Sequence, residues 1–204
     1  MQTVLFIDGR NFLGKLKQVF KAAHRPMPSW ATFDFRGLVD HVLKGVAVDE
    51  RRIYFARLVF HPQTADKSRA LIEERRHLKR HLESTGFTYI VSGHVRANVV
   101  KDAYGHEALA FKEKGVDTKI VTDLVVAACD RKVKTAIIAS SDSDLQPAVK
   151  ELKLRRIEQI YLGFEIEPNK GLTYTTDRTI LIRNAEVLQF MGTSTLPFES
   201  KEAA

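Results

Sequence analysis

Cysteine is almost absent from this chain, which has one cysteine, Cys129, in 204 residues. A single thiol excludes an internal disulfide and a zinc site built from several cysteines. Cys129 lies in the apolar run LVVAACD, which has the pattern of a helix. We therefore expect a buried structural thiol at this position rather than a nucleophile.

Long apolar stretches and targeting signals are also missing. No segment approaches the ~18 consecutive apolar residues of a membrane-spanning helix. The N-terminal sequence QTVLFI has the pattern of a strand, and it lacks the basic region and small-residue cleavage site of a leader peptide. We expect a soluble protein in the cytoplasm, without a membrane partner.

The common nucleotide-binding and hydrolase motifs do not occur either. The sequence contains no G-x-x-x-x-G-K-S/T loop, no G-x-G-x-x-G turn and no G-x-S-x-G elbow. Its histidines are scattered and do not show the spacing of a zinc-binding helix. These absences argue against the usual nucleotide-binding folds, serine hydrolases and helical zinc enzymes.

Positive charge is in excess, with 32 Lys and Arg against 25 Asp and Glu and a formal net charge of +7. A basic balance favours a polyanionic partner such as nucleic acid. A well-solvated basic surface would explain the charge equally well. The contrast with a few acidic residues at the ends of apolar runs favours the first interpretation.

Apolar runs and helical patterns alternate along the chain, which predicts an α/β fold: a three-layer sandwich with a central, mainly parallel sheet. In the basic helix expected at 65–84, Leu71, Leu78 and Leu82 would form a buried stripe. Residues 93–116 look irregular, and 169–190 would add a short helix or strand. We expect one domain over 1–190 and a loose tail over 191–204. The predicted strands are 2–7, 51–60, 87–91, 135–140 and 157–164; the predicted helices are 11–23, 35–45, 65–84, one opened by Asp117 as its N-cap and one after Asp144.

Several carboxylates follow directly on apolar runs. Asp8 ends VLFI and precedes Gly9, and Asn11 lies one helical turn later. In open α/β sheets, ligands bind at the carboxyl ends of the strands. Acids gathered there suit a hard divalent cation, whose usual work is phosphate chemistry. A turn with a helix cap, which needs no ligand, explains Asp8 and Asn11 equally well.

The second group of acids lies in KEKGVDTKIVTD. Asp117 is placed to cap the following helix, and Asp123 lies among apolar residues, where an unpaired charge is costly unless it is a ligand. A simple cap and a solvated face remain open for these two. Glu113 stands in a Lys-Glu-Lys run, which is typical of a solvated surface.

The third group, SSDSD, is the most specific. Asp142 and Asp144 are one residue apart directly after AIIAS. Their charges repel at close range unless a cation or a basic group offsets them. Nearby serine hydroxyls and the start of the next helix could hold a phosphate oxygen. This pattern indicates a functional role rather than a structural turn.

Together, FIDGRN, EKGVDTKIVTDLV and SSDSDLQPAVKEL resemble the signature of the NYN domain, a branch of the PIN-like nuclease superfamily. That family has Asp-x-x-Asn after its first strand, Lys-Gly-x-Asp opening a helix that carries a second Asp, and Ser-Gly-Asp-x-Asp-Phe-x-Pro after its fourth strand. The segments occur in the same order, and the similarity covers residues 2 to about 190. The chain departs at Ser141, where Gly is common, and at Leu145, where Phe is common, but no carboxylate is lost.

The resemblance implies a PIN-like, Rossmann-like fold and a ribonuclease that hydrolyses RNA phosphodiester bonds with Mg²⁺ or Mn²⁺. Its RNA would be single-stranded or structured. The catalytic residues that it implies are Asp8, Asn11, Asp117, Asp142 and Asp144. The metal ligands would be Asp8, Asp117, Asp123, Asp142 and Asp144. The candidates to contact the RNA backbone are Arg10, Arg96, Lys101, Lys112 and Lys114.

Other functions remain open at this stage. The chain could be an inactive RNA-binding or adaptor module that has kept the acids. A small-molecule phosphatase fits the acids but explains the positive charge less well, and an Asp-x-Asp at the first strand is lacking. The basic helix at 67–80 could extend an RNA track, form a solvated face or dock a protein partner, and a homodimer is also open.

Overall fold

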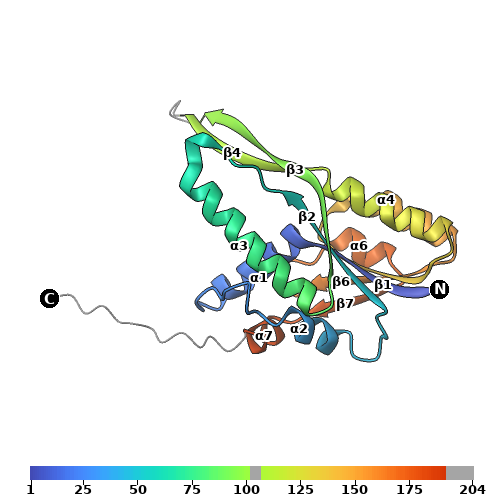
Figure 1. The fold of residues 1–204 in the computed structure, drawn as a ribbon. Coiled ribbons are helices and arrows are strands. Elements are labelled where there is room, and N and C mark those ends of the chain that lie inside the picture. Colours follow the sequence, from blue (N-terminus) through green and yellow to red (C-terminus); the bar gives the residue numbers. More distant parts are fainter. Residues whose placement is uncertain (102–106, 192–204) are drawn as a thin grey trace.

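A computed structural model describes residues 1–101 and 107–191, without the side chains of Gln63, 96–101 and 107–112. Strands and helices alternate along most of the chain (Figure 1). In chain order, the elements are β1 Gln2–Asp8, α1 Gly9–Ala22, α2 Phe35–Val42, β2 Glu50–Arg57, a 3₁₀ turn Pro62–Thr64, α3 Ala65–Ser84, β3 Thr88–Lys101, β4 Glu107–Lys114, α4 Val116–Cys129, β5 Val133–Ala139, a 3₁₀ turn Ser143–Leu145, α5 Gln146–Leu154, β6 Glu158–Phe164, α6 Lys170–Thr175, β7 Arg178–Ile182 and α7 Asn184–Gln189.

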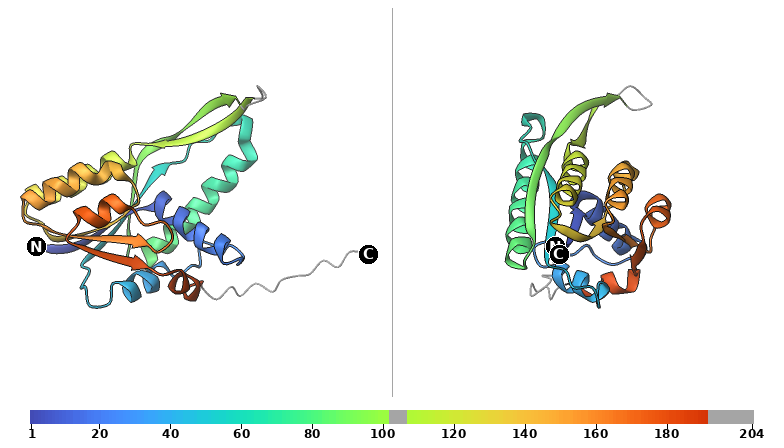
Figure 2. Two further views of the ribbon diagram at one scale, coloured as in Figure 1. Left: turned by 180° about the vertical axis from the view of Figure 1, so that it is seen from behind. Right: turned by 90° about the vertical axis from the view of Figure 1, so that its right-hand side faces the viewer.

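Within the described residues, seven strands form one sheet in the order β4-β3-β2-β1-β5-β6-β7. All neighbouring pairs are parallel except β3 and β4, which form an antiparallel pair at one edge. Helices cover both faces of the sheet, and α3 and α4 lie on opposite sides of it (Figures 1 and 2). The predicted three-layer α/β sandwich with a mainly parallel sheet is confirmed.

The sheet is buried on both faces, as parallel sheets covered by helices generally are. In β1, Leu5 and Ile7 join the core under α1, α2, the C-terminal half of α3 and α7. Val4 and Phe6 point to the other face and pack under α4 and α5. The central strands are therefore continuous apolar runs in the sequence, and polar residues occur mainly at the ends of these strands.

The expectation that residues 93–116 are irregular is wrong. β3 continues from Thr88 to Lys101 and pairs with β4 in a register that runs from His94↔Lys114 to Lys101↔Glu107. Figure 1 shows these two strands extending past the end of the other strands. Polar residues occur throughout this segment because it lies at the sheet edge, and that composition concealed the two strands in the sequence.

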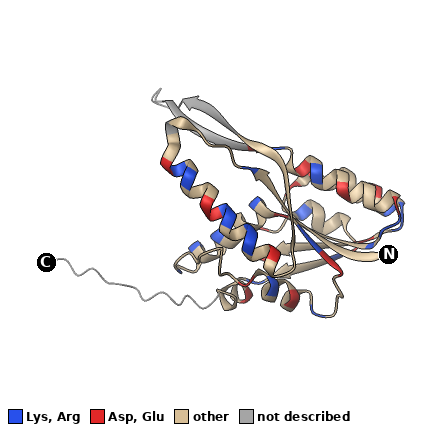
Figure 3. Cartoon of the chain, viewed as in Figure 1, with Lys and Arg blue, Asp and Glu red and all other residues tan. Residues whose placement is uncertain are grey.

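The stripe expected on α3 is only partly buried. Leu78 and Leu82 are buried, as predicted, but Leu71 is 44% exposed. The helix packs against the core through its C-terminal half and leaves its N-terminal half largely uncovered. Lys and Arg residues alternate with Asp and Glu along it (Figure 3).

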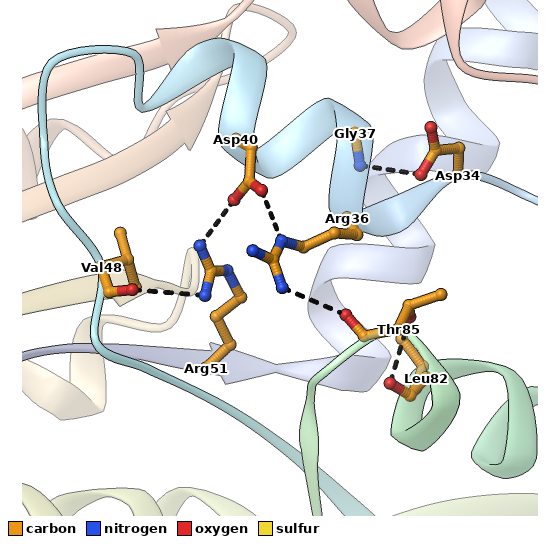
Figure 4. A network of polar contacts seen from close by, with 8 residues as sticks. All are labelled: Asp34, Arg36, Gly37, Asp40, Val48, Arg51, Leu82 and Thr85. Atoms are coloured by element: carbon orange, nitrogen blue, oxygen red, sulfur yellow. Dashed lines mark hydrogen bonds and ion pairs between the residues drawn. The ribbon is translucent and has the colours of Figure 1, made fainter.

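A polar network fixes the end of α3 to α2 and β2 (Figure 4). Asp40 on α2 accepts hydrogen bonds from Arg36 and from Arg51 Nη2, the second over 2.6 Å. Arg36 also donates to the carbonyl of Thr85, which follows α3. Although partial burial opposes ionisation, these two guanidinium groups hold the pKa of Asp40 below its usual value.

Two further expectations concern Cys129 and the chain's end. Cys129 is exposed rather than buried, because α4 turns Ile120, Leu124 and Ala128 toward the core and leaves the cysteine on its outer side. Residues 169–190 contain both a strand and short helices. The predicted tail over 191–204 lies, after Met191, outside the described residues. In the described part of the chain, no helix has the length and apolarity needed to cross a bilayer.

Candidate active site

A pocket of about 540 Å³ opens where β1 and β5, two neighbouring strands, end. The first three turns of α1, the end of β4, the start of α4 and the loop after β5 surround it. It brings together Asp8, Asn11, Asp117 and Asp142 from three separate sequence motifs. Its lining consists of Asp8, Arg10, Asn11, Gly14, Lys15, Gln18, Glu113, Val116, Asp117, Ser141 and Asp142.

Asp8 lies deepest in this group, with 7% of its surface exposed. It ends β1 and caps α1, since its Oδ1 accepts a hydrogen bond from the Asn11 amide over 3.0 Å. Burial is the main cause that raises the pKa of Asp8 to about 6. The Asn11 N–H opposes the rise, and the carboxylates of Asp117, Glu113 and Asp142 add to it. Asp8 therefore lies buried among carboxylates whose negative charge disfavours its own ionisation.

Asp117 enters the pocket from the first turn of α4. The cap of this helix is Gly115, with φ +90°, and not Asp117 as expected. Gly115 faces Gly93, which also has positive φ, and a Cβ at Gly93 would lie 1.9 Å from the Lys114 carbonyl. The two glycines thus allow the chain to turn from β4 directly into α4. Burial and the nearby Asp142 raise the pKa of Asp117.

Glu113 corrects an expectation, since it is a half-buried member of the pocket rather than a solvated surface residue. Its Oε1 accepts a hydrogen bond from the backbone amide of Ala56 on β2 over 3.0 Å. Its Oε2 lies 3.7 Å from Arg10 Nη1. Burial raises the pKa of Glu113, while the Ala56 N–H and Arg10 oppose that rise.

Asp142 and Asp144 form a compact turn after β5. Oδ1 of Asp142 accepts a hydrogen bond from the Asp144 amide over 2.9 Å, which caps the 3₁₀ turn. Asp142 lines the pocket, whereas Asp144 is exposed outside the lining. Because Asp144 follows Asp142 in the same turn, we call it the rim residue. Its charge adds to the burial and the Asp142 charge that raise the pKa of Asp117.

The side chain of Asn11 is held by the loop after β5. Its Oδ1 accepts hydrogen bonds from the Ser141 hydroxyl over 2.7 Å and from the Ser141 amide over 3.3 Å. The Ser141 carbonyl in turn accepts a hydrogen bond from Asn169 Nδ2 over 2.8 Å. With its oxygen engaged by Ser141, Asn11 can offer its Nδ2 donors to a ligand, since no hydrogen bond joins Nδ2 to the described residues. Asn169, in the loop after β6, gave no signal in the sequence.

Among the side chains that the structure describes, two cations line the pocket. Arg10 is largely exposed beside Glu113. Lys15 Nζ donates hydrogen bonds to the carbonyl and to the carboxylate of Glu167, each over 3.1 Å. Lys15 was not among the predicted contacts. Lys114 is exposed and does not line the pocket. The structure does not describe the side chains of three other predicted RNA contacts, Arg96, Lys101 and Lys112.

Asp123 lies apart from the other acids and already has two partners. Its Oδ2 accepts a hydrogen bond from the hydroxyl of the buried Tyr54 over 3.0 Å, and Lys119 Nζ lies 2.6 Å from its Oδ1. Six residues after Asp117, it points to another face of α4. Asp123 does not contribute to the pocket lining.

The donor set of the pocket consists of carboxylate oxygens, which hard divalent cations prefer. Buried carboxylates repel one another and raise one another's pKa, and a bound cation offsets that repulsion most directly. Among the described residues, no three His, Cys, Asp or Glu side chains already lie close enough to enclose an ion by themselves. The arrangement can nevertheless bring several acidic oxygens, an amide donor and two cations to one ligand.

Comparisons with known proteins bear on the family and the fold of this chain. A search of curated proteins found no match. A protein of unknown function from Vibrio parahaemolyticus has a similar structure, with a TM-score of 0.57 and 15% sequence identity over 89% of this chain and 93% of the other. That likeness shows the fold alone. The family model of the NYN domain matches residues 2–183, which includes every acidic residue discussed above. The chain belongs to the NYN domain family, a branch of the PIN-like nucleases.

Proposed function

We propose that this protein is a ribonuclease that depends on Mg²⁺ or Mn²⁺ and hydrolyses RNA phosphodiester bonds in the pocket. The observation that carries the proposal is the convergence of Asp8, Asp117 and Asp142, from distant motifs, around one opening. Family membership supports a nuclease, and the positive net charge supports a polyanionic substrate.

The donor set fits the metal. Asp8, Asp117 and Asp142 would hold it, with Glu113 and the rim residue Asp144 acting directly or through water. Mg²⁺ is commonly held by one or two carboxylates together with water and substrate phosphates, so an open set of acids is compatible with it. When bound, the metal would activate water and stabilise negative charge on the phosphate oxygens. Asp123, which is engaged by Tyr54 and Lys119, is left out of this set.

The chain's own residues would orient the scissile phosphate. Asn11 Nδ2 would donate to a phosphate oxygen or to the attacking water, because its Oδ1 is held by Ser141. Arg10 would lie beside an incoming phosphate, and its pairing with Glu113 at 3.7 Å is loose enough to be exchanged. Asp8 would keep the start of α1 fixed through its bond to the Asn11 amide.

The proposal is tested with labelled single-stranded RNA, structured RNA and DNA, each incubated with the protein in Mn²⁺, Mg²⁺ or EDTA. We expect cleavage of RNA in the presence of the metals and none in EDTA. Asp142→Asn should abolish cleavage while the protein stays folded, since asparagine also caps a turn. The matched control is Asp34→Asn, because Asp34 caps α2 through Gly37 in the same way but lies away from the pocket.

Unchanged cleavage by Asp142→Asn would refute the site. Salt-sensitive RNA binding without cleavage in any divalent metal would instead indicate an RNA-binding module that has kept the acids.

A further inference from the structure

A second hollow lies beside the pocket, between α3, the end of β2 and the start of β3. It has a volume of about 300 Å³. We call it the α3 groove and define it by its lining: Ala56, Arg57, Leu58, Ile72, Arg75, Arg76, Lys79, Tyr89 and Val91.

The groove exists because α3 leaves part of the sheet uncovered. Its C-terminal half packs against the core through Leu78 and Leu82. Val91 on β3, which lines the groove, is 48% exposed. The floor of the groove is thus apolar surface open to solvent, which in a folded protein commonly marks a site of interaction.

The charged side chains that line this floor are all positive. The lining includes the cations Arg57, Arg75, Arg76 and Lys79, and no acidic residue occurs among the described lining residues. Arg76 and Lys79 pair with Glu73 and Glu83 on the outer side of α3. Such exposed pairs contribute little stability, so these cations can turn to an anionic ligand at small cost.

Aromatic rings lie directly under the cations. Phe55 and Tyr89 stack with ring centroids 5.0 Å apart. The guanidinium of Arg75 lies 4.1 Å from the Phe55 centroid, and Lys79 Nζ lies 5.8 Å from the Tyr89 centroid. Phe55 is fully buried, so Tyr89, which lines the groove, is the ring that a ligand can meet. An aromatic ring beside several cations is typical of surfaces that bind single-stranded nucleic acid.

The groove and the candidate active site share a wall. Ala56 lines the groove, and its amide donates to Glu113, which lines the pocket. Phe55 packs so closely under Gly9, the residue after Asp8, that a Cβ at Gly9 would lie 2.3 Å from its ring. A bound strand that runs from the pocket past Glu113 would therefore enter the α3 groove next.

We propose that the α3 groove binds an unpaired nucleotide of the RNA, next to the phosphodiester at the candidate active site. The base would lie on the apolar floor at Tyr89 and Val91, and the flanking phosphates would contact Arg57, Arg76 and Lys79. The volume is at the lower end of ~300–1,000 Å³ for small-ligand sites, which suits one nucleotide. Bases in a duplex are paired and stacked on one another, so the groove selects single-stranded RNA. The identity of the ligand rests on the proposed function.

The test measures binding rather than turnover, so that it does not depend on cleavage. A fluorescein-labelled 12-nucleotide oligouridylate and a 12-base-pair RNA duplex are titrated with the full chain in EDTA, and anisotropy is recorded at several salt concentrations. Two variants change the groove: Arg57→Gln/Lys79→Gln removes two exposed cations, and Val91→Asp places a charge on the exposed floor. The matched control, Lys134→Gln/Lys150→Gln, removes two exposed cations on β5 and α5, outside both hollows.

We expect wild type to bind the single strand more tightly than the duplex. The groove pair should weaken single-strand binding by about 10-fold and reduce the salt dependence, because each lost phosphate contact lowers the slope. Val91→Asp should weaken single-strand binding by about 10-fold, the order of one lost stacking contact. The control pair should bind almost as wild type does.

Equal losses in the control and groove pairs would overturn the proposal, as would groove variants that bind normally. A wild-type dimer that Val91→Asp converts to a monomer with unchanged RNA binding would show that a second copy covers the groove instead. Groove-dependent binding by a protein that cleaves nothing would refute the proposed ribonuclease activity while leaving the groove's role intact.

Discussion

The hydroxyl of Ser141 donates a 2.7 Å hydrogen bond to Oδ1 of Asn11, a residue 130 positions earlier in the chain. The bond joins the loop after β5 to the start of α1, and both residues line the pocket. It also sets which end of the Asn11 amide is available, because a carboxamide with its oxygen engaged offers its nitrogen as a donor. Ser141 stands where a glycine is common in the family, and a glycine could supply only its backbone amide here.

We therefore predict that Ser141→Ala lowers the rate of RNA cleavage by about 10-fold, the order found when a residue that orients a catalytic group is removed. Affinity for RNA, measured in EDTA, should change little, since no phosphate contact is lost. The control is Ser143→Ala, an exposed serine two residues later in the same loop. Equal cleavage by Ser141→Ala and wild type would show that Asn11 does not depend on this hydroxyl.

The second prediction concerns how the buried charge of Asp8 lowers the free energy of unfolding. The pKa of Asp8 is raised from an ordinary value of 3.8 to about 6, mainly by burial. The unfolded chain releases the Asp8 proton at a lower pH than the folded protein does. The free energy of unfolding therefore falls as the pH rises from about 4 to about 6. Without metal, Asp8→Asn should therefore be more stable than wild type above pH 6, by at most about 3 kcal/mol, and should differ little below pH 4. Asparagine keeps the cap on α1.

Urea unfolding in EDTA at pH 4 and pH 7.5 measures this difference. Asp34→Asn, which changes an exposed cap on α2, should show no comparable gain at pH 7.5. Added Mn²⁺ should stabilise wild type more than Asp8→Asn, because a ligand that binds only the folded state raises its stability. A variant that is less stable than wild type at pH 7.5 without metal would contradict the prediction.

Much of this fold is predictable from sequence because the central strands are apolar on both faces. QTVLFI and TAIIAS read as strands, and the acid that follows each is carried to the edge where parallel strands end. That rule alone places Asp8 and Asp142 near each other. The motif that opens α4 at Gly115 places Asp117 with them.

Glu113 could not be found in this way. Its neighbours Lys112 and Lys114 suggest a solvated surface, and it becomes half buried because the antiparallel pairing of β4 with β3 brings it to Ala56 on β2. That pairing depends on contacts between strands, which a local pattern does not contain. The exposure of Leu71 and Cys129 has a similar origin, since helical periodicity shows an apolar stripe but not how far the sheet extends beneath it.

Asp123 separates a structural role from a metal-binding role. Tyr54 is fully buried, and its hydroxyl donates to Asp123, so removing the acceptor leaves a buried donor unpaired. We predict that Asp123→Ala lowers the free energy of unfolding by about 1–3 kcal/mol, while cleavage of RNA at saturating Mn²⁺ stays close to wild type. Asp117→Ala, on the same helix, should do the opposite: cleavage is lost and stability is retained. Loss of cleavage by folded Asp123→Ala would return Asp123 to the ligand set.

The last prediction gives Glu113 a role in holding the metal. Its carboxylate lines the pocket and contributes to the negative charge around Asp8. Glu113→Gln keeps an oxygen for the Ala56 amide, so the attachment of β4 to β2 should survive, but it removes one charge that attracts the cation. We expect the Mn²⁺ concentration for half-maximal cleavage to rise by about 10-fold, as for changes beside a metal ligand, with little loss at saturating metal. Glu151→Gln, on the exposed face of α5, is the control. An unchanged Mn²⁺ requirement for Glu113→Gln would leave Glu113 as a strand attachment only, and a loss that excess Mn²⁺ does not restore would place it in the chemistry itself.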